Sequence, residues 1–311
     1  MCALTVLDLF SGMGGMSYGF AEAGFEVTGV DIAEDAGIAY REFTGGSFVR
    51  ADLSEYDPDC NFDVVVGSPP CRPWSPLNVS KRGDRHSDYL FPLRFAEIVA
   101  RLKPKAFVLE NVPAMAGDRE TAETLGLLGS AGYKLARGTV YRYSDFGAAT
   151  SRKRFVAAGF RNWEAAIAFE EEMKSAMSPG LTVGDAAMKY RYMEKGGEPD
   201  HVWPEFRTIM KYRQKYMEGK YGWRKLEWAL PAPSFGNVMK TYTLHPDSDL
   251  ATGSNLRVIS VLEAARIMGI DHGFMFPEGI PVGRRYQMIA DSVSPVFSAK
   301  LANSLKRAVE R

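Results

Sequence analysis

Phe62-Asp-Val-Val-Val-Gly-Ser-Pro-Pro-Cys71-Arg-Pro-Trp-Ser-Pro76 is the stretch that decides the fold. Its apolar run, bounded by Gly67 and two prolines, predicts a short buried strand that ends abruptly. Cys71 follows between Pro70 and Pro73, and the loop is stiff because proline fixes φ and restricts the residue before it. A thiol at the carboxyl end of a strand suits a nucleophile, since α/β sheets bind ligands at that edge. The alternative interpretation is a small buried cysteine in a proline turn.

Length, hydrophobicity and cysteine content narrow the class of protein. The 311 residues, 46% of them hydrophobic, allow one large α/β domain with an insertion, or two domains. We see no apolar run long enough for a membrane span and no secretory signal, so we expect a cytoplasmic protein. Three cysteines without CxxC spacing fit a reducing compartment and disfavour a disulfide framework or a zinc site, and we predict no metal.

The charge balance excludes a simple nucleic-acid coat protein, because Lys plus Arg and Asp plus Glu number 38 each. Any contact with nucleic acid must therefore come from local clusters. One cluster, Lys81, Arg82 and Arg85, follows the Cys71 loop. A second, between residues 207 and 225, interleaves basic residues with tyrosine and tryptophan. A charge run is often only a solvated face, but the interleaved aromatic residues favour nucleic acid.

Strands alternate with helices through the first half of the chain, which predicts an α/β fold with a doubly wound, mostly parallel sheet. The expected strands are Thr5–Phe10, Glu26–Asp31, Phe48–Asp52, the strand before Cys71, Ala106–Val112, Lys134–Tyr143 and Arg154–Phe160. One helix is expected directly after the first glycine-rich loop. Two more are expected over about Tyr89–Leu102 and over Ala122–Gly132.

The pattern changes in the middle of the chain. From about Asn162 to Leu256 periodicity fades while glycine, proline, tryptophan and tyrosine increase, which predicts a separate irregular lobe. A long insertion that serves only stability is the alternative. Helical pattern returns where Ser260 and Glu263 predict a capping box and Gly269 a C-cap. A last helix is expected near residues 294–309. The predicted boundaries are therefore residues 1–161, 162–256 and 257–311.

A glycine-rich loop and two acids indicate a nucleoside site. Gly12-x-Gly14-Gly15 follows the first strand but lacks the GxGxxG spacing, so it suits a nucleoside without a pyrophosphate. Asp31, at the end of the second strand, can accept from ribose hydroxyls, and Asp52 from an adenine amino group. A tight strand-to-helix turn is the alternative. Glu110 ends another apolar strand, where a carboxylate is costly unless it is used or paired.

Five motifs in one order carry a resemblance to a known family. They are Asp8-Leu-Phe-Ser-Gly-Met-Gly-Gly15, Pro70-Cys71-Arg-Pro-Trp-Ser75, Glu110-Asn111-Val112, Arg152-Lys-Arg154 and Arg257-Val-Ile-Ser-Val-Leu-Glu263-Ala-Ala-Arg266. The sequence resembles the DNA (cytosine-5-)-methyltransferase family of the bacterial or phage restriction–modification type, over nearly the whole chain apart from the middle lobe. The resemblance implies a Rossmann-like fold that depends on S-adenosylmethionine, with residues 162–256 as a smaller target-recognition domain.

The resemblance also implies a reaction on C5 of a flipped-out cytosine in a specific double-stranded DNA sequence. The Cys71 thiolate adds to C6 and so makes C5 nucleophilic. Glu110 protonates or hydrogen-bonds N3 and accepts from N4, Arg154 holds O2, and Arg152 orients the base or a phosphate. The implied cofactor-binding residues are Asp8, Phe10, Ser11, Gly12, Gly14, Gly15, Asp31, Ile32, Asp52, Leu53, Pro70, Asp291, Ser292 and Val293. The implied DNA-binding residues are Ser75, Lys81, Arg82, Arg85, Arg213, Arg224 and Arg257.

Two positions depart from the family pattern. Thr150 stands where a glutamine usually precedes the Arg-x-Arg pair, and Ala290-Asp291 stands where the family usually has Gly-Asn. An acid at 291 could repel the cofactor's carboxylate or favour its amino group or sulfonium.

Three other functions remain open. A tRNA cytosine-C5 methyltransferase shares the catalytic domain, but the Cys-Phe-Thr tripeptide of that branch is absent. A non-catalytic DNA-binding relative would usually lose the nucleophile or the acid. An NAD-type oxidoreductase would leave Pro70-Cys71 unexplained. We expect a monomer, with no stable complex with a cognate restriction endonuclease and no membrane partner.

Overall fold

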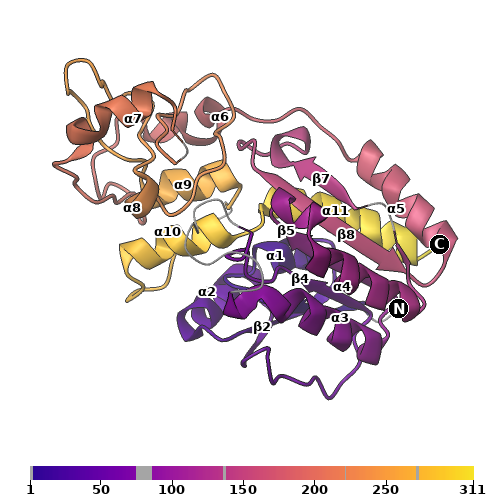
Figure 1. Ribbon diagram of the computed structural model, residues 1–311. Coiled ribbons are helices and arrows are strands. Elements are labelled where there is room, and N and C mark those ends of the chain that lie inside the picture. Colours follow the sequence, from indigo (N-terminus) through magenta and orange to yellow (C-terminus); the bar gives the residue numbers. More distant parts are fainter. Residues whose placement is uncertain (1–2, 75–85, 136–137, 221, 271–272) are drawn as a thin grey trace. The chain divides into compact units, whose positions relative to one another are not determined.

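The chain divides into two compact units, and each is described by itself (Figure 1). The computed structural model describes residues 3–74, 86–135, 138–220, 222–270 and 273–311. The sheet unit comprises Met1–Arg142, Lys153–Met177 and Phe297–Arg311. The loop-rich unit comprises Tyr143–Arg152 and Ser178–Val296. The boundaries inferred from the sequence remain a prediction about functional domains.

Eight strands of the described chain form one sheet in the order β3-β2-β1-β4-β5-β8-β6, with β7 also paired to β8. The strands are β1 Thr5–Leu9, β2 Glu26–Asp31, β3 Ser47–Arg50, β4 Val64–Gly67, β5 Ala106–Asn111, β6 Lys134–Leu135, β7 Thr139–Arg142 and β8 Lys153–Phe160. The pairs among β1 to β5 are parallel, and the pairs made by β8 are antiparallel. The predicted doubly wound, mostly parallel sheet is confirmed.

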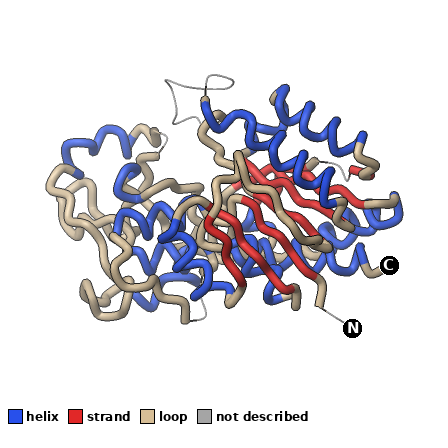
Figure 2. Tube along the Cα trace, turned by 90° about the horizontal axis from the view of Figure 1, so that it is seen from below, coloured by secondary structure: helices blue, strands red, loops and turns tan. Residues whose placement is uncertain are grey.

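Helices cover both faces of this sheet (Figure 2). They are α1 Gly15–Glu22, α2 Glu34–Thr44, α3 Phe91–Leu102, α4 Arg119–Ser130, α5 Trp163–Ser175 and α11 Pro295–Val309, with the short 3-10 helices η2 Ser87–Leu90 and η3 Pro113–Gly117. Successive strand residues face opposite sides, which β1 illustrates. Leu7 and Leu9 join the core formed with α3 and α4, whereas Asp8 bonds to Ser17 of α1.

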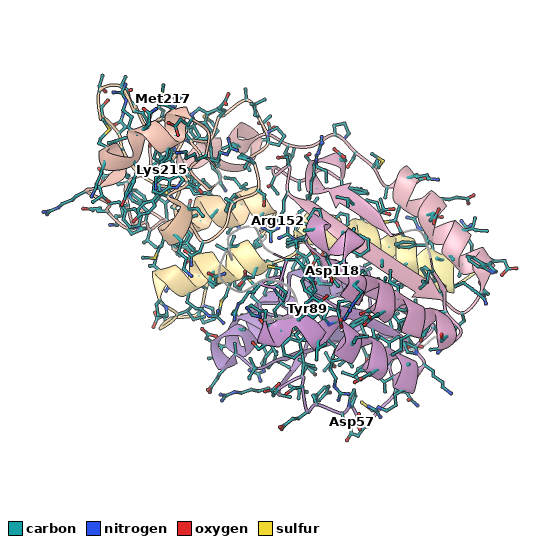
Figure 3. All side chains as sticks on the ribbon, viewed as in Figure 1. Asp57, Tyr89, Asp118, Arg152, Lys215 and Met217 are labelled. Atoms are coloured by element: carbon teal, nitrogen blue, oxygen red, sulfur yellow. The ribbon has the colours of Figure 1, made fainter. Side chains whose placement is uncertain are left out.

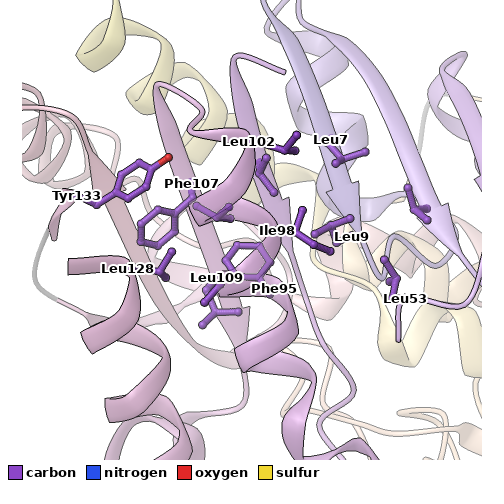
Figure 4. Close-up of a cluster of buried hydrophobic side chains, with 14 of the residues drawn as sticks. Leu7, Leu9, Leu53, Phe95, Ile98, Leu102, Phe107, Leu109, Leu128 and Tyr133 are labelled. Carbon is purple, nitrogen blue, oxygen red and sulfur yellow. The ribbon is translucent and has the colours of Figure 1, made fainter. Parts of the chain in front are cut away.

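The core on the α3 and α4 side packs against the central strands of the sheet (Figure 4). Val64, Val65 and Val66 are fully buried, as expected of a strand covered on both faces. Phe107 of β5 packs edge-on against Phe95 of α3, with ring centroids 6.1 Å apart. This packing fixes where β4 and β5 lie against α3, and therefore where the Cys71 loop and Glu110 lie at the ends of these strands.

The loop-rich unit holds short helices and isolated β-bridges. Its helices are η4 Tyr143–Asp145, α6 Val183–Ala187, η5 Met188–Tyr190, η6 Ile209–Tyr212, α7 Arg213–Met217, α8 Val238–Thr241, α9 Val261–Met268 and α10 Val282–Asp291. The capping box of α9 is confirmed, because Ser260 Oγ accepts from Glu263 N and Glu263 Oε2 accepts from Ser260 N. Gly269, at φ 81°, ends this helix as predicted.

Three features differ from the expected elements. α5 is a regular helix of 13 residues, in a stretch that we expected to lack periodicity. The strand expected over residues 134–143 is two strands, β6 and β7, and β3 ends at Arg50 rather than at Asp52. None of the helices in the described residues combines the length and apolar character needed to cross a membrane.

Candidate active site

The Cys71 loop is fixed to the carboxyl edge of the sheet from two neighbouring strands. Ser68 N donates to Leu9 O of β1 at 3.2 Å. Asn111 Nδ2, at the end of β5, donates to Pro69 O at 2.8 Å. These bonds hold the backbone on the amino-terminal side of Cys71, whose side chain is half-buried. The predicted nucleophile therefore lies at the ligand-binding edge of the sheet.

Glu110 and Arg154 form a buried ion pair at the same edge. Glu110 of β5 is opposite Val156 of β8, and Arg154 lies two residues along β8. Arg154 Nε is 3.1 Å from Glu110 Oε1, and the two side chains are 12% and 6% exposed. Oε1 nevertheless has no partner in hydrogen-bonding geometry among the described residues. The carboxylate therefore keeps hydrogen-bonding capacity for a ligand, beside a cation that compensates its charge.

The backbone of the glycine-rich loop is open to a ligand. Phe10 and Gly12 adopt φ 61° and 53°, and Gly14, at φ 92°, is the N-cap of α1. A Cβ at Gly12 would meet nothing within 4 Å. Ser11 is buried, yet its Oγ has no hydrogen-bond partner among the described residues. An open backbone beside an unsatisfied hydroxyl is the arrangement that a bound polar ligand would complete.

Asp8 lies beneath this loop in a buried hydrogen-bonded chain. Its Oδ2 accepts from Ser17 Oγ at 2.6 Å, and Ser17 Oγ accepts from Tyr40 O–H at 2.8 Å. Burial raises the pKa of Asp8 to about 7, against the opposing effect of the Ser17 hydrogen bonds and with smaller contributions from Asp31 and Glu110. Asp8 thus supports the loop from inside the sheet unit.

Of the two predicted nucleoside-binding acids, Asp31 ends β2 and Asp52 lies two residues beyond the end of β3. Asp31 accepts from Gly12 N and from Ala33 N, both at 3.0 Å, which ties β2 to the glycine-rich loop. Asp52 is exposed, and hydrogen bonds from Ser54 hold its pKa below the usual range. Ile32 is 60% exposed and Leu53 is buried. These residues, with Ser11 and Gly12, fit S-adenosylmethionine: acceptors for hydroxyl and amino groups beside an exposed apolar side chain.

Arg152 belongs to the loop-rich unit, as do Ala290 and Asp291, which depart from the family pattern. Arg152 is buried, and its Nη2 donates to Ala290 O at 2.6 Å, at the end of α10. Asp291 accepts at both carboxylate oxygens from Gln287 Nε2, at 2.9 Å each. Ser292 and Val293 are buried. Thr150 Oγ1 donates to Ala232 O at 3.1 Å. Arg152 thus contacts the segment predicted to bind the cofactor.

The predicted DNA-binding residues fall into three groups. Ser75, Lys81, Arg82 and Arg85 lie outside the described residues. Arg213 and Arg224 are exposed on the loop-rich unit. Arg257 is bound to Glu263 through Nη1 and Nη2, at 2.7 and 2.8 Å, and its side chain is 15% exposed. A DNA contact by Arg257 therefore stays a prediction, and the guanidinium that would make this contact is already bound to Glu263.

The aromatic residues interleaved with the second basic cluster pack against one another. Trp223 stacks on Tyr242 with ring centroids 5.2 Å apart and planes 10° apart, and Tyr212 packs 4.6 Å from Trp223. Lys215 lies on α7 (Figure 3). Its Nζ lies over both Tyr212 and Trp223, at 4.8 and 4.6 Å. These rings form a local core that carries exposed basic side chains.

Sequence reasoning overlooked residues whose role depends on contacts across the fold. Asn111, inside the Glu-Asn-Val motif, anchors Pro69, and its place beside Glu110 was a usable signal. Ser17 and Tyr40 hold Asp8 without any local pattern that marks them. Among the described residues, no group of three or more His, Cys, Asp or Glu side chains could hold a metal ion.

Comparison with known proteins places these features in one family. Residues 4–307 match the family model of C-5 cytosine-specific DNA methylases. Type II methyltransferase M.NlaX of Neisseria lactamica is 27% identical over 320 residues, which cover 98% of this chain and 96% of that protein. Type II methyltransferase M1.HphI of Haemophilus parahaemolyticus is 28% identical over 331 residues, which cover 97% of this chain and 87% of the relative.

Solved structures share the fold. A putative DNA modification methyltransferase encoded within an E. coli prophage superposes with a TM-score of 0.72, at 21% identity, covering 99% of this chain and 100% of the other. The S. pombe Dnmt2 methyltransferase gives a TM-score of 0.73 at 17% identity, covering 98% and 99% of the two chains.

Proposed function

This chain belongs to the C-5 cytosine-specific DNA methylase family and is a methyltransferase that acts on cytosine, and from that premise we propose its mechanism. In this proposal a methyl group passes from S-adenosylmethionine to C5 of a flipped-out cytosine in a specific double-stranded DNA sequence, through a covalent bond between Cys71 and C6. The observation that carries the proposal is the buried Glu110–Arg154 pair. Glu110 is followed on the same strand by Asn111, which anchors the Cys71 loop.

Cys71 acts as the nucleophile. C5 of cytosine is a weak nucleophile, and addition of the thiolate to C6 turns it into an enamine-like carbon. The Pro–Cys loop presents the thiol at the sheet edge on a backbone held at Ser68 and Pro69. After transfer, loss of the C5 proton and expulsion of the thiolate restore the C5–C6 double bond.

Glu110 and Arg154 bind the polar edge of the base. Addition at C6 pushes electrons toward N3, so a carboxyl group that protonates or hydrogen-bonds N3 stabilises the intermediate. Glu110 Oε1, buried and without a hydrogen-bond partner among the described residues, suits this role. Arg154 keeps the carboxylate in place and holds O2 of the base. A stacked cytosine cannot be surrounded in this way, so the base is flipped out of the duplex.

The glycine-rich loop, Asp31 and Asp52 would hold the cofactor. When S-adenosylmethionine is bound, it supplies an electrophilic methyl group. Asp31 would accept from the ribose hydroxyls and Asp52 from the adenine amino group, and Ser11 Oγ would gain the partner that it lacks among the described residues. Gly12, whose backbone is open, lets the ligand approach closely.

Double-stranded DNA is the proposed substrate, and a restriction–modification system is the proposed setting. The relatives named above are type II methyltransferases, which supports this setting. We propose a cytoplasmic monomer without a stable endonuclease complex. The basic residues Arg213 and Arg224 contribute DNA contacts, and Lys81, Arg82 and Arg85 are proposed to bind phosphates.

The test is transfer of label from radiolabelled S-adenosylmethionine to double-stranded DNA of mixed sequence, with total tRNA assayed in parallel. Cys71→Ser should abolish turnover while DNA and cofactor binding persist, because a hydroxyl does not replace the thiolate. Label in DNA cytosine that disappears in the variant supports the proposal. Retained turnover in the variant would refute the covalent mechanism, and label in tRNA alone would make the tRNA methyltransferase the better candidate.

A further inference from the structure

The Cys71 turn has an anchor on its carboxyl side as well. Trp74 N donates to Cys71 O at 3.0 Å and closes the turn that contains Arg72 and Pro73. The indole of Trp74 is 7% exposed, and its Nε1 has no hydrogen-bond partner among the described residues. The side chain is therefore held by packing, in the same buried cluster as Tyr89.

Tyr89 makes a ring contact with Trp74. The ring centroids of Trp74 and Tyr89 are 5.6 Å apart, with the planes tilted by 32°. Tyr89 is also buried and belongs to η2, which precedes α3. A second contact joins the same two segments, because Arg72 Nη1 lies 3.8 Å from Asp88 Oδ2. Arg72 is largely exposed, so the ion pair contributes little and the ring contact dominates.

Tyr89 is fixed in turn by Asp118. Its hydroxyl donates to Asp118 Oδ1 at 2.9 Å, and the same oxygen accepts from Glu120 N at 3.0 Å as the N-cap of α4 (Figure 3). Burial and this hydrogen bond raise the pKa of Tyr89 to about 12, so the hydroxyl remains a donor at neutral pH. Asp118 follows η3, the turn that leads on from Glu110 and Asn111 of β5.

Cys71 is therefore held on both sides by groups that come from one segment, residues 110–118. Asn111 binds the backbone before it, and Asp118 acts through Tyr89 and Trp74 on the backbone after it. The same segment begins with Glu110, so the distance between nucleophile and acid depends on both anchors.

We propose that Trp74, Tyr89 and Asp118 form a positioning chain that fixes the Cys71 turn relative to Glu110. This inference rests on the proposed function and goes beyond it, because none of the three residues touches the substrate in the mechanism above. Near-attack geometry is sensitive, since a displacement of about 1 Å can cost about 100-fold in rate. Loss of the Tyr89 hydroxyl frees the ring to shift and loosens the turn without creating a large cavity.

The test compares Tyr89→Phe with a matched control, Tyr133→Phe. Tyr133 is also buried, and its hydroxyl donates to Pro104 O at 2.9 Å, before the start of β5 and so at the amino end of that strand. Each variant loses one buried hydroxyl that bonds to an acceptor. Single-turnover rates are measured at saturating DNA and S-adenosylmethionine. We expect Tyr89→Phe to slow transfer about 10-fold with little change in KM for the cofactor, and Tyr133→Phe to stay within about 2-fold of wild type.

Alkylation by iodoacetamide supplies a readout that does not depend on methyl transfer. Cys60 is exposed, so its alkylation rate is an internal reference for that of Cys71. The ratio of Cys71 to Cys60 alkylation, resolved by peptide mass spectrometry, should rise in Tyr89→Phe and in Trp74→Ala but not in Tyr133→Phe. Equal rates and equal ratios in Tyr89→Phe and Tyr133→Phe would overturn the positioning chain. Turnover by Cys71→Ser would instead refute the proposed function, and the alkylation ratio would still decide the inference.

Discussion

Each unit of this protein contains a buried glutamate paired with an arginine, and the two pairs are built differently. In the loop-rich unit Glu263 accepts from Arg257 Nη1 and Nη2 at 2.7 and 2.8 Å, and from Ser260 N at 2.8 Å. Burial alone would raise the pKa of Glu263, but the hydrogen bonds and charge of Arg257 outweigh it and hold the pKa below its usual range. This carboxylate is fully engaged by the protein.

In the sheet unit Glu110 makes one close contact with its arginine. Arg154 Nε lies 3.1 Å from Oε1, outside hydrogen-bonding geometry, and Arg154 Nη1 donates to Lys153 O instead. A fork of two parallel bonds, as in Arg257–Glu263, is the stronger arrangement. The fold therefore satisfies one buried carboxylate and leaves the other to be completed by a ligand. A buried Glu–Arg pair is structural or reactive according to how much of its hydrogen-bonding capacity the protein itself uses.

The largest expected effect that separates the pairs is on the rate of chemistry. Glu110→Gln keeps size and polarity but removes the acid, so we expect methyl transfer to slow by about 10²–10⁴-fold. DNA and cofactor binding should change far less, because Glu110 acts mainly on the intermediate. Single-turnover kinetics with separate binding titrations measure both quantities. An unchanged rate would remove Glu110 from the proposed role and make its pair structural, like that of Glu263.

The corresponding change in the loop-rich unit should act on stability instead. Glu263→Gln leaves Arg257 without its charge partner and weakens the capping box of α9, so we expect unfolding to become easier by about 3–5 kcal/mol. Glu110→Gln should cost about 1 kcal/mol, because a single contact is lost. Urea unfolding followed by tryptophan fluorescence measures this difference. Equal losses of stability in the two variants would show that the difference in bonding has no energetic consequence.

Much of the sheet unit was predictable from the sequence because its signals are local. The apolar run before Gly67 and the Gly12 loop each act within a few residues, and so does the Ser260–Glu263 capping box in the loop-rich unit. α5 also carried such a signal: Asn162 caps it, and the buried Ala165, Phe169 and Met173 recur at helical spacing. That signal was outweighed by the irregular composition of the residues that follow.

The contacts that distinguish the two pairs were not predictable. Arg257 and Glu263 are six residues apart, yet only the fold shows that the guanidinium turns toward the carboxylate. Arg154 and Glu110 are 44 positions apart in the chain, and their meeting depends on the antiparallel register of β5 with β8. A basic residue in sequence carries no sign of whether it will reach DNA or a buried acid, because that choice is made by packing between distant segments.

The smallest effect, and the sharpest contrast, concerns pH. Burial lowers the pKa of His245 to about 4. The negative charge of Glu263 opposes this shift, and the positive charge of Arg257 adds to it. Between pH 6.5 and about 4 the unfolded chain therefore binds a proton that the folded chain does not, and stability falls on acidification by about 2 kcal/mol at pH 5. Asp8 has the opposite sign. Its folded pKa, raised to about 7, makes stability greatest at low pH and smaller as pH rises from about 4 to 7.

Urea unfolding at pH 5.0 and 7.5 resolves the two contributions through single variants. His245→Gln removes the acid-sensitive group, so its stability should fall less than that of wild type between pH 7.5 and 5.0. Asp8→Asn removes the ionisation that opposes folding, so its stability should fall more over the same interval. Each variant serves as the control for the other, because both replace a buried ionisable group by a neutral amide. If both variants shifted the pH dependence of stability in the same direction, the prediction that Asp8 and His245 contribute with opposite signs would be wrong. A shift confined to His245→Gln would instead mean that the carboxylate of Asp8 is already solvated in the folded protein. The glycine-rich loop would then be supported by Ser17 and Tyr40 alone.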